Sequence, residues 1–399
     1  MIHASHQAAM RRAAAWLTLL TLGLVLAWAL SGSLPPVARG IAGYVPLHTL
    51  FETLAVVVAG LVFAVSWHAH SRELPGNTLI LGCAFLGVGL LDFSHLLSFP
   101  GMPDYVTPSN PEKAINFWLA ARTLAALALL AAALVPWRPF TRGATRYGLL
   151  AAVLVATAGV HCLFLLQPDI VPRTFVPGQG LTPFKTGAEY GLVALNLGAA
   201  LALWRRMRMR TPQPFDAPAL FVAVCTMALS ELFFTLYASL TDVYNLMGHL
   251  YKVLAYLFLY RAIFVETVQR PQRQLLAAQS QLRSTFDAIP DLLFIKDADG
   301  VYVDCNPAVE RLYGTTRADF VGKTPEDFVS AEEAAAFRAQ DRKVIAAGKP
   351  ISHEEWRTAA RDGERALFQT IKTPMRDAQG GLIGVLAISR DITQTHAAR

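Results

Sequence analysis

The first two thirds of the chain alternate between long apolar runs and short polar breaks. Eight runs of 18 to 24 residues match the ~20 apolar residues that an α-helix needs to cross a bilayer. The breaks carry turn residues, among them Pro75-Gly76-Asn77 and Pro100-Gly101. The pattern predicts a polytopic α-helical membrane domain of about eight spans over residues 14–265. The predicted spans are 14–31, 47–67, 78–98, 116–135, 147–166, 186–204, 217–240 and 244–265.

The pattern changes to short alternating segments after residue 284. Turn residues such as Asp299-Gly300 and Asp362-Gly363 separate these segments. Helical patterns follow Asn306-Pro307 and fill 331–347, where Gly348 ends the helix. The order strand–strand–helices–three strands predicts an α+β domain over 285–395, with a five-stranded antiparallel sheet and helices on one face. The predicted strands are 292–297, 301–305, 351–359, 366–373 and 382–389.

A third segment, 266–284, joins the two parts. Its apolar residues recur at helical spacing through Gln-rich sequence, although Pro271 must kink or interrupt such a helix. We interpret it as a signalling helix that pairs with a second copy of the chain in a short parallel coiled coil. A solvated amphipathic linker is the alternative. The apolar positions are Phe264, Val265, Val268, Leu275, Leu276 and Leu282.

Composition supports a membrane protein and sets its orientation. Hydrophobic residues make up 54% of the chain and charged residues 16%, which disfavours an ordinary soluble protein. The net charge of +6 does not indicate a nucleic-acid partner, because much of it lies in short loops between apolar runs. One set of loops holds ten Lys or Arg residues and the opposite set holds four, so both termini are predicted to be cytoplasmic. The richer set is Arg11, Arg12, Arg72, Arg138, Arg142, Arg146, Arg205, Arg206, Arg208 and Arg210; the poorer set is Arg39, Lys113, Arg173 and Lys185.

Ionisable residues within the predicted spans gather at one depth, in the outward-facing half. Such residues are expensive in a bilayer and commonly mark function. Three pairs stand three or four residues apart, which places both members on one helix face. We therefore predict a polar ligand-binding pocket shared by many helices. Its candidate residues are His48, Glu52, Asp92, His95, Arg122, His161, Glu189, Glu231, His249 and Lys252.

Simpler interpretations exist for individual members of this set. His48 and Glu189 lie near helix ends, where they can be interfacial residues in water. Arg122 and Lys252 can serve as structural partners of buried carboxylates. A single His161 is more often a hydrogen-bonded packing residue than a ligand.

The ligand chemistry stays open at this point. Imidazole with carboxylate suits zinc, copper or iron, whereas Arg and Lys beside His suit an anion or an organic acid. The segments carry no closely spaced H-x-x-x-H pair, so the sequence assigns no metal.

Several blocks in the membrane part resemble the third membrane-associated sensor family of bacterial signalling proteins. They include Leu91-Asp92-Phe93-Ser94-His95, the stretch 117–122, the stretch 178–185, and the stretch from Glu231 to Lys252. The resemblance covers about residues 15–268. It implies a multi-helix sensor module of unassigned ligand in the bacterial inner membrane, N-terminal to cytoplasmic output domains.

The soluble part strongly resembles a PAS domain. The resemblance is carried by the stretch 291–294, Asp299-Gly300, the stretch 305–308, Tyr313-Gly314 and the stretch 391–393. It implies that Asp391, Ile392 and Thr393 link the last strand to an output helix and so transmit the signal.

A cofactor of this domain stays unassigned. The reactive-cysteine motif of flavin relatives is absent around Cys305, and no His lies on the helix 331–347. His353 is interpreted as a solvated strand residue. Trp356 is interpreted either as facing the sheet pocket or as core packing.

The sequence ends eight residues after Asp391 and carries no phosphoacceptor helix, cyclase motif or phosphate-binding loop. We therefore expect a receptor without its own catalytic domain: a truncated gene product, or a homodimeric partner of a separate histidine kinase or diguanylate cyclase. The alternative is a transporter or membrane enzyme with an appended regulatory PAS domain, since buried acids and histidines can relay protons.

Overall fold

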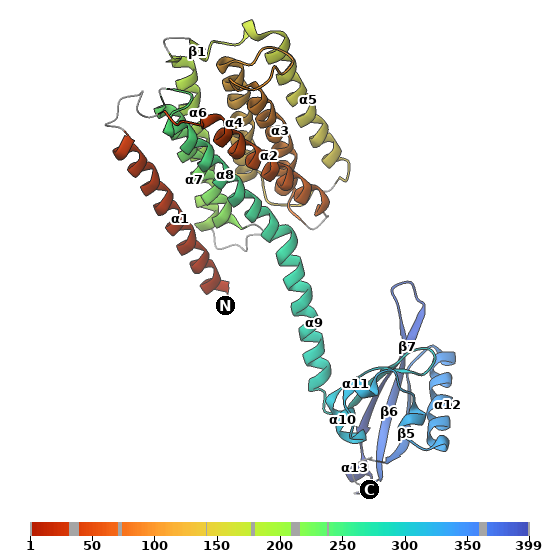
Figure 1. The fold of residues 1–399 in the computed structure, drawn as a ribbon. Helices are drawn as coiled ribbons and strands as arrows, with labels where there is room; N and C mark the ends of the chain where they lie inside the picture. The colour runs from red at the N-terminus through yellow and green to blue at the C-terminus, as the bar shows by residue number, and fades with distance from the viewer. Residues whose placement is uncertain are drawn as a thin grey trace. The chain divides into compact units, whose positions relative to one another are not determined.

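The computed structural model describes residues 2–31, 40–70, 74–140, 142–176, 180–208, 216–237, 239–358 and 365–397. The chain divides into two compact units, Met1–Gln272 and Arg273–Arg399 (Figure 1). Within the described residues, the regular elements of the first unit are helices and one two-stranded hairpin, whereas the second unit contains a five-stranded sheet. Arg39, Arg72 and Arg210, the stretch 177–179 and the turn Asp362-Gly363 lie outside the described residues.

Eight helices of the first unit coincide with the eight predicted spans to within a few residues at most ends. The main exception is the first helix, which begins earlier. Seven of them, α1 to α7, are long and apolar enough to cross a membrane among the residues that the structure describes. The eighth carries more polar residues but packs between α2 and α7. The helices are α1 (Ile2–Ser31), α2 (Tyr44–His68), α3 (Gly76–Ser98), α4 (Pro111–Leu134), α5 (Thr145–Leu166), α6 (Pro183–Arg208), α7 (Ala217–Leu236) and α8 (Val243–Phe264).

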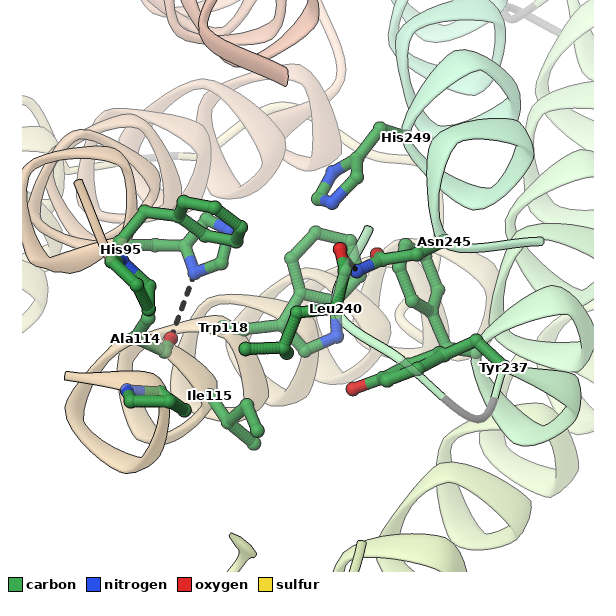
Figure 2. Close-up of a pocket in the computed structure, with 12 residues that line it drawn as sticks. His95, Ala114, Ile115, Trp118, Tyr237, Leu240, Asn245 and His249 are labelled. Atoms are coloured by element: carbon green, nitrogen blue, oxygen red, sulfur yellow. Dashed lines mark hydrogen bonds between the residues drawn. The ribbon is translucent and has the colours of Figure 1, made fainter. Parts of the chain in front are cut away.

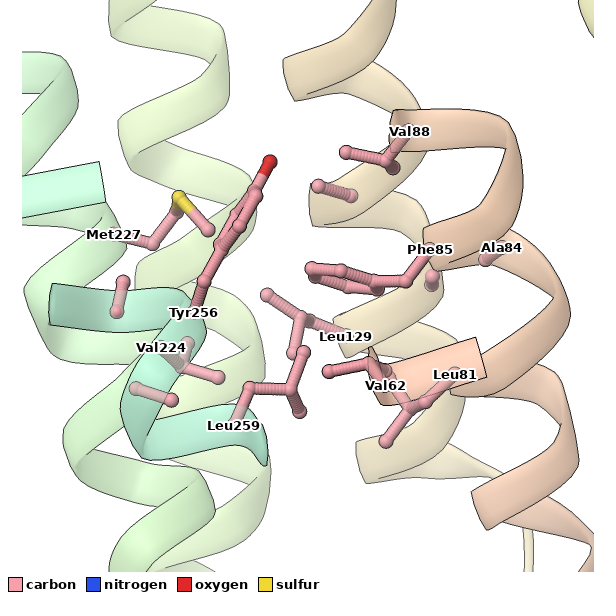
Figure 3. Close-up of a cluster of buried hydrophobic side chains, with 14 of the residues drawn as sticks. Val62, Leu81, Ala84, Phe85, Val88, Leu129, Val224, Met227, Tyr256 and Leu259 are labelled. Carbon is pink, nitrogen blue, oxygen red and sulfur yellow. The ribbon is translucent and has the colours of Figure 1, made fainter. Parts of the chain in front are cut away.

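The interior of this bundle holds a large cluster of buried apolar side chains. Phe85 from α3, Leu129 from α4 and Leu259 from α8 converge there (Figure 3). Small residues let the helices approach closely: a Cβ added at Gly89 of α3 would stand 3.3 Å from the Cβ of Ala59 on α2. The loop between α5 and α6 adds η2 (Pro168–Ile170) and a short hairpin of β1 (Phe175–Val176) and β2 (Gly180–Leu181).

Helix α8 leads without a loop into a π-helical turn, η3 (Val265–Gln269), and then into α9 (Arg270–Ala288). The predicted effect of Pro271 thus takes a specific form. Proline removes a backbone donor and clashes with the preceding turn, and the wider π turn accommodates it while the chain stays helical. The apolar residues Leu275, Leu276 and Leu282 of α9 are 57–71% exposed.

The second unit has the predicted strand–strand–helix–strand order. Its antiparallel sheet runs in the order β4-β3-β7-β6-β5, so the first and last strands of the unit are neighbours in the middle of the sheet. Helix α12 contacts β6 and β7, while α10 contacts β3 and α11 contacts β4. The strands are β3 (Leu292–Lys296), β4 (Tyr302–Cys305), β5 (Ile351–Thr358), β6 (Arg365–Arg376) and β7 (Leu382–Asp391). The helical elements are α10 (Pro307–Tyr313), α11 (Arg317–Phe320), η4 (Pro325–Asp327), α12 (Ala331–Ala347) and α13 (Thr393–Ala397).

Two interpretations of β5 side chains need correction. Trp356 faces neither a pocket nor the core, because it is 46% exposed; the Arg365 guanidinium lies over its ring at 5.6 Å. Alternation along β5 places it on the opposite side from buried Arg357. His353 is half-buried rather than solvated, and its Nε2 lies 3.1 Å from Glu355 Oε2.

Gly384 is the most constrained position of this sheet. Its φ is +155°, and a Cβ there would stand 2.0 Å from the carbonyl oxygen of Lys296 on β3. We expect Gly384→Ala to destabilise the PAS unit by at least about 1–3 kcal/mol, the cost of a strained backbone alone. Hydrogen exchange of β3 and β7 peptides in the full chain measures the loss. Gln379→Ala, in the exposed turn before β7, is the control and should leave exchange unchanged.

Candidate functional site

Two histidines from neighbouring helices meet in the polar part of the bundle. His48 of α2 and His95 of α3 are buried, and their Nε2 atoms are 3.2 Å apart. His95 Nδ1 donates a hydrogen bond of 2.7 Å to the carbonyl of Ala114 at the start of α4. Because a carbonyl only accepts, this bond places the His95 proton on Nδ1 and leaves Nε2 facing His48 with its lone pair. His48 is therefore not the interfacial residue of the simpler interpretation.

A carboxylate and two basic groups extend this pair on the side of α8. Glu52 stands one turn after His48 on α2 and is fully buried. Its Oε1 accepts from the ammonium of Lys252 and lies 2.6 Å from His249 Nδ1. The i,i+4 and i,i+3 spacings bring these side chains to one place, as the sequence indicated.

A second buried ion pair adjoins the first. Arg122 of α4 donates to both carboxylate oxygens of Asp92, at 2.8 and 2.9 Å. The Tyr256 hydroxyl donates to Asp92 Oδ2 at 2.9 Å and also contacts Arg122. Lys252 Nζ is 3.8 Å from Asp92 Oδ1, which joins the two ion pairs into one network. Seven candidate residues lie in this network: His48, Glu52, Asp92, His95, Arg122, His249 and Lys252.

Glu189 and Glu231 form an acidic pair beside the network. Both are fully buried and lie close enough for their charges to interact, and Glu231 also lies within the electrostatic reach of Arg122. Lys185, one turn before Glu189 on α6, is 3.1 Å from that carboxylate and also donates to the carbonyl of Phe234. Burial at 0% exposure rules out the interfacial interpretation of Glu189.

His161 lies apart from both groups. Its Nε2 is 2.7 Å from the Ser94 hydroxyl, its Nδ1 is 2.8 Å from the Thr157 carbonyl, and its ring packs on Phe117. These contacts satisfy the ring, which matches the packing interpretation.

Sequence reasoning missed three residues that contact these groups: Tyr256 and Trp118 in the network, and Lys185 beside Glu189. Tyr256 follows Lys252 by four residues, Trp118 precedes Arg122 by four, and Lys185 precedes Glu189 by four. Trp118 lies under both cations, 4.8 Å from the Arg122 guanidinium carbon and from Lys252 Nζ. The same i,i+4 rule applied to aromatic and basic neighbours would have found them.

A small cavity borders the network. Its lining includes His95, Trp118, Tyr237, Asn245 and His249 (Figure 2). Its volume of ≈ 20 Å³ is enough for about one water-sized species.

The PAS unit holds a charged group of its own. The ammonium groups of Lys296 and Lys372 lie 2.9 and 2.6 Å from the carboxylate of Asp341 on α12. Burial lowers the pKa of Lys296 to about 8, against the attraction of Asp341. Burial acts to raise the pKa of Asp341, but the two lysines hold it below its ordinary value. Glu355, paired with Arg357, likewise has a lowered pKa despite burial.

The C-terminal motif is bound to the sheet. Thr393 donates from its backbone nitrogen and its hydroxyl to Asp391 Oδ1, at 2.8 and 2.6 Å. Its hydroxyl also accepts from Leu367 of β6, and Ile392 donates to the carbonyl of the same residue. The motif therefore fixes the start of α13 against the middle of the sheet.

Comparison with known families agrees with this architecture: a multi-pass membrane protein that pairs a sensor domain with a PAS domain. The sequence model of MASE3, described as a membrane-associated sensor domain, matches residues 40–271, more than half of the chain. The chain belongs to this family. The PAS fold model matches residues 286–397.

Curated relatives are signalling proteins that match part of the chain. The methanogenesis regulatory histidine kinase FilI of Methanothrix harundinacea is 35% identical over 121 residues, which is 30% of this chain and 13% of that protein. The aerobic respiration control sensor ArcB of Escherichia coli is 36% identical over 115 residues, 29% of this chain and 15% of that protein. A diguanylate cyclase of Vibrio cholerae is 29% identical over 102 residues, 25% of this chain and 32% of that protein. The chain thus spans less than a third of the length of each.

Proposed function

We propose that this chain is the sensory part of a bacterial inner-membrane receptor. A ligand binds at the network of His48, Glu52, Asp92, Arg122 and their neighbours, and the PAS unit relays the change to a cytoplasmic effector. The observation that carries the proposal is the burial of so many ionisable groups in one connected network inside a membrane bundle. Burying charge there is costly, and such groups are commonly retained for function.

Helix α8 is the proposed transmission element. It contributes His249, Lys252 and Tyr256 to the network, and the helical run continues through η3 into α9. Ligand binding can shift a two-state receptor only through contacts that differ between the states. Because three network residues lie on α8, a ligand bound at the network can make contacts with this helix that differ between the two states. Asp391, Ile392 and Thr393 then carry the change from the sheet to α13.

The partners follow from α9 and from the relatives. Leu275 and Leu282 of α9 stand seven residues apart, the repeat of a coiled coil, and both are more than 60% exposed. This supports a homodimer joined along the segment 266–284, between a sensor domain at 14–265 and a PAS domain at 285–395. The kinase and cyclase relatives support a histidine kinase or a diguanylate cyclase as effector. The basic loops support cytoplasmic termini.

A fused reporter tests the proposal without a known ligand. The chain is joined after residue 397 to a diguanylate cyclase domain, and cyclic-di-GMP is measured in cells. Because Glu52 bridges α2 and α8, we expect Glu52→Gln to shift the basal output several-fold. Leu275→Pro, which breaks α9, should remove that difference. Thr123→Val, an exposed change on α4, is the control.

Output that stays the same in folded, membrane-inserted Glu52→Gln, Lys252→Met and His249→Ala variants would refute the sensor proposal. The same holds if Leu275→Pro preserves the difference between wild type and Glu52→Gln, since α9 would then not transmit it.

The Glu189–Glu231 pair favours a transporter as second candidate. Two interacting carboxyl groups inside a membrane bundle suit a proton relay, with Lys185 as a third member. Proton or solute flux in proteoliposomes that is lost in Glu231→Gln would support it. Absence of flux beside a working fused reporter would eliminate it.

A further inference from the structure

Four side chains of the network have the composition of a metal site. One ligand atom from each of His48, Glu52, His95 and His249 lies within 4.8 Å of the other three, and all four residues are at most 5% exposed. We propose that these residues bind one divalent first-row transition-metal ion, of which Zn²⁺ is the best fit. This inference rests on the proposed sensory function and names the chemical class of its signal.

Ligand type and spacing agree with such an ion. Three imidazoles and a carboxylate suit zinc and its neighbours, whereas magnesium and calcium require mostly oxygen ligands. Ligands at about 2.0 Å from a tetrahedral zinc lie about 3.3 Å from one another. The Nε2 atoms of His48 and His95 are 3.2 Å apart, close to one edge of that tetrahedron. Ligand atoms of His249 and Glu52 lie within 4.8 Å of this pair, so both residues can supply the remaining ligands.

The hydrogen bond of His95 is a second, independent observation. Metal-bound histidines usually donate their other ring nitrogen to a carbonyl or carboxylate, which fixes the tautomer and aims the lone pair at the metal. His95 does this through Nδ1 and the Ala114 carbonyl (Figure 2). Its Nε2 is thus held ready, and facing it is another ring nitrogen, from His48.

Several buried atoms of the group are short of partners. Within the described part of the chain, His48 Nδ1, Glu52 Oε2 and His249 Nδ1 have no hydrogen-bond partner, although His249 Nδ1 stands 2.6 Å from Glu52 Oε1. Buried polar atoms are rarely left so, because desolvation is then uncompensated. Glu52 Oε2 is free to bind a cation while Oε1 faces His249 and Lys252.

Lys252 of α8 links metal binding to a change in the contacts of that helix. Its ammonium group supplies the positive charge beside Glu52, the role that a divalent ion would take over. Displaced from Glu52, it has Asp92 Oδ1 at 3.8 Å as its next carboxylate. Metal binding therefore moves Lys252 of α8 from Glu52 to Asp92. The transmission helix then has different contacts in the metal-free and metal-bound states.

Zinc titration of the purified full chain in detergent, without a polyhistidine tag, tests the site. Calorimetry and metal analysis should give one Zn²⁺ per chain and no binding of Mg²⁺. We expect His48→Ala/His95→Ala to weaken zinc binding at least about 100-fold. The matched control is His68→Gln/His70→Gln, a histidine pair at the end of α2 outside the network, and it should bind zinc as wild type does.

Lys252→Met is expected to increase zinc affinity, a result that a damaged fold would not produce. Removing the competing ammonium should tighten zinc binding about ten-fold, equivalent to about 1.4 kcal/mol. The site is refuted if wild type takes up no stoichiometric zinc, if binding survives His48→Ala/His95→Ala, or if Lys252→Met weakens it.

The fused reporter separates this inference from the proposed function. A zinc-dependent output that disappears in His48→Ala/His95→Ala supports both. Zinc-insensitive output that still changes in Glu52→Gln refutes zinc as the signal and keeps the sensor. Stoichiometric zinc with no response to any network variant keeps the site and refutes the sensor.

Discussion

Replacing Arg122 by Met is expected to destabilise the membrane unit more than any other single change in the network. The variant leaves Asp92 charged, buried and without its guanidinium partner, and breaking a buried pair in this way costs about 3–5 kcal/mol. Tyr256 and Lys252 compensate only in part, because Tyr256 supplies one hydrogen bond and Lys252 is already held by Glu52. The loss appears as faster hydrogen exchange of α3, α4 and α8 in the detergent-solubilised chain.

A double variant separates loss of a partner from loss of the pair. Asp92→Leu/Arg122→Met removes both charges, and we expect it to recover most of the stability that Arg122→Met loses. Thr123→Val, one residue further along α4 and exposed, should remain within about 0.5 kcal/mol of wild type. A double variant as unstable as the single one would show that the site requires the ion pair itself.

The second large effect is expected in the PAS unit on replacing Asp341 by Asn. This carboxylate pairs with both Lys296 and Lys372, so the variant leaves two buried ammonium groups without it and should cost about 3–5 kcal/mol at pH 7. Hydrogen exchange of β3 and β6 peptides reports the change. Glu332→Gln, exposed in the first turn of the same helix, is the matched control.

The pH dependence of this deficit has a definite sign. Asp341 has a lowered pKa when folded, so its contribution is present above the ordinary aspartate pKa of about 4 and is lost as the pH falls. Lys296 has a folded pKa of about 8, below the lysine value of about 10.4. Between pH 8 and about 10.4, Lys296 is protonated more in the unfolded state than in the folded state, so the free energy of unfolding rises with pH. The Asp341→Asn deficit should therefore be smaller at pH 9 than at pH 7, and a constant deficit would contradict the charge argument.

Periodicity predicted the elements of this fold well because it depends on local chemistry. Apolar runs near 20 residues gave eight helices, and Gly348 ended α12 where its φ of 62° requires a residue that tolerates the left-handed conformation. The π turn at Val265–Gln269 was beyond such reasoning. Pro271 indicated a disturbance, but its form depends on how the chain packs around it.

The sequence selected candidate residues for a site but not their geometry. Depth and spacing selected ten residues, of which the structure brings seven into one network, and nothing in the order of the chain separates that network from the Glu189–Glu231 pair or sets His161 aside. Those distinctions depend on which helices are neighbours, as α2 and α3 are for His48 and His95. Trp356 was misjudged for a related reason, since a one-residue difference in strand register exchanges inside for outside.

The π turn also changes the helical phase between α8 and α9. A π turn holds one residue more than an α turn, so helical phase extrapolated from His249 and Lys252 is wrong by one residue, about 100°, beyond Gln269. Helical wheels for α8 and α9 must therefore be drawn separately. A relative without Pro271 and without this turn would align through the joint with a single-residue gap and would present its α9 leucines on the same face as this chain.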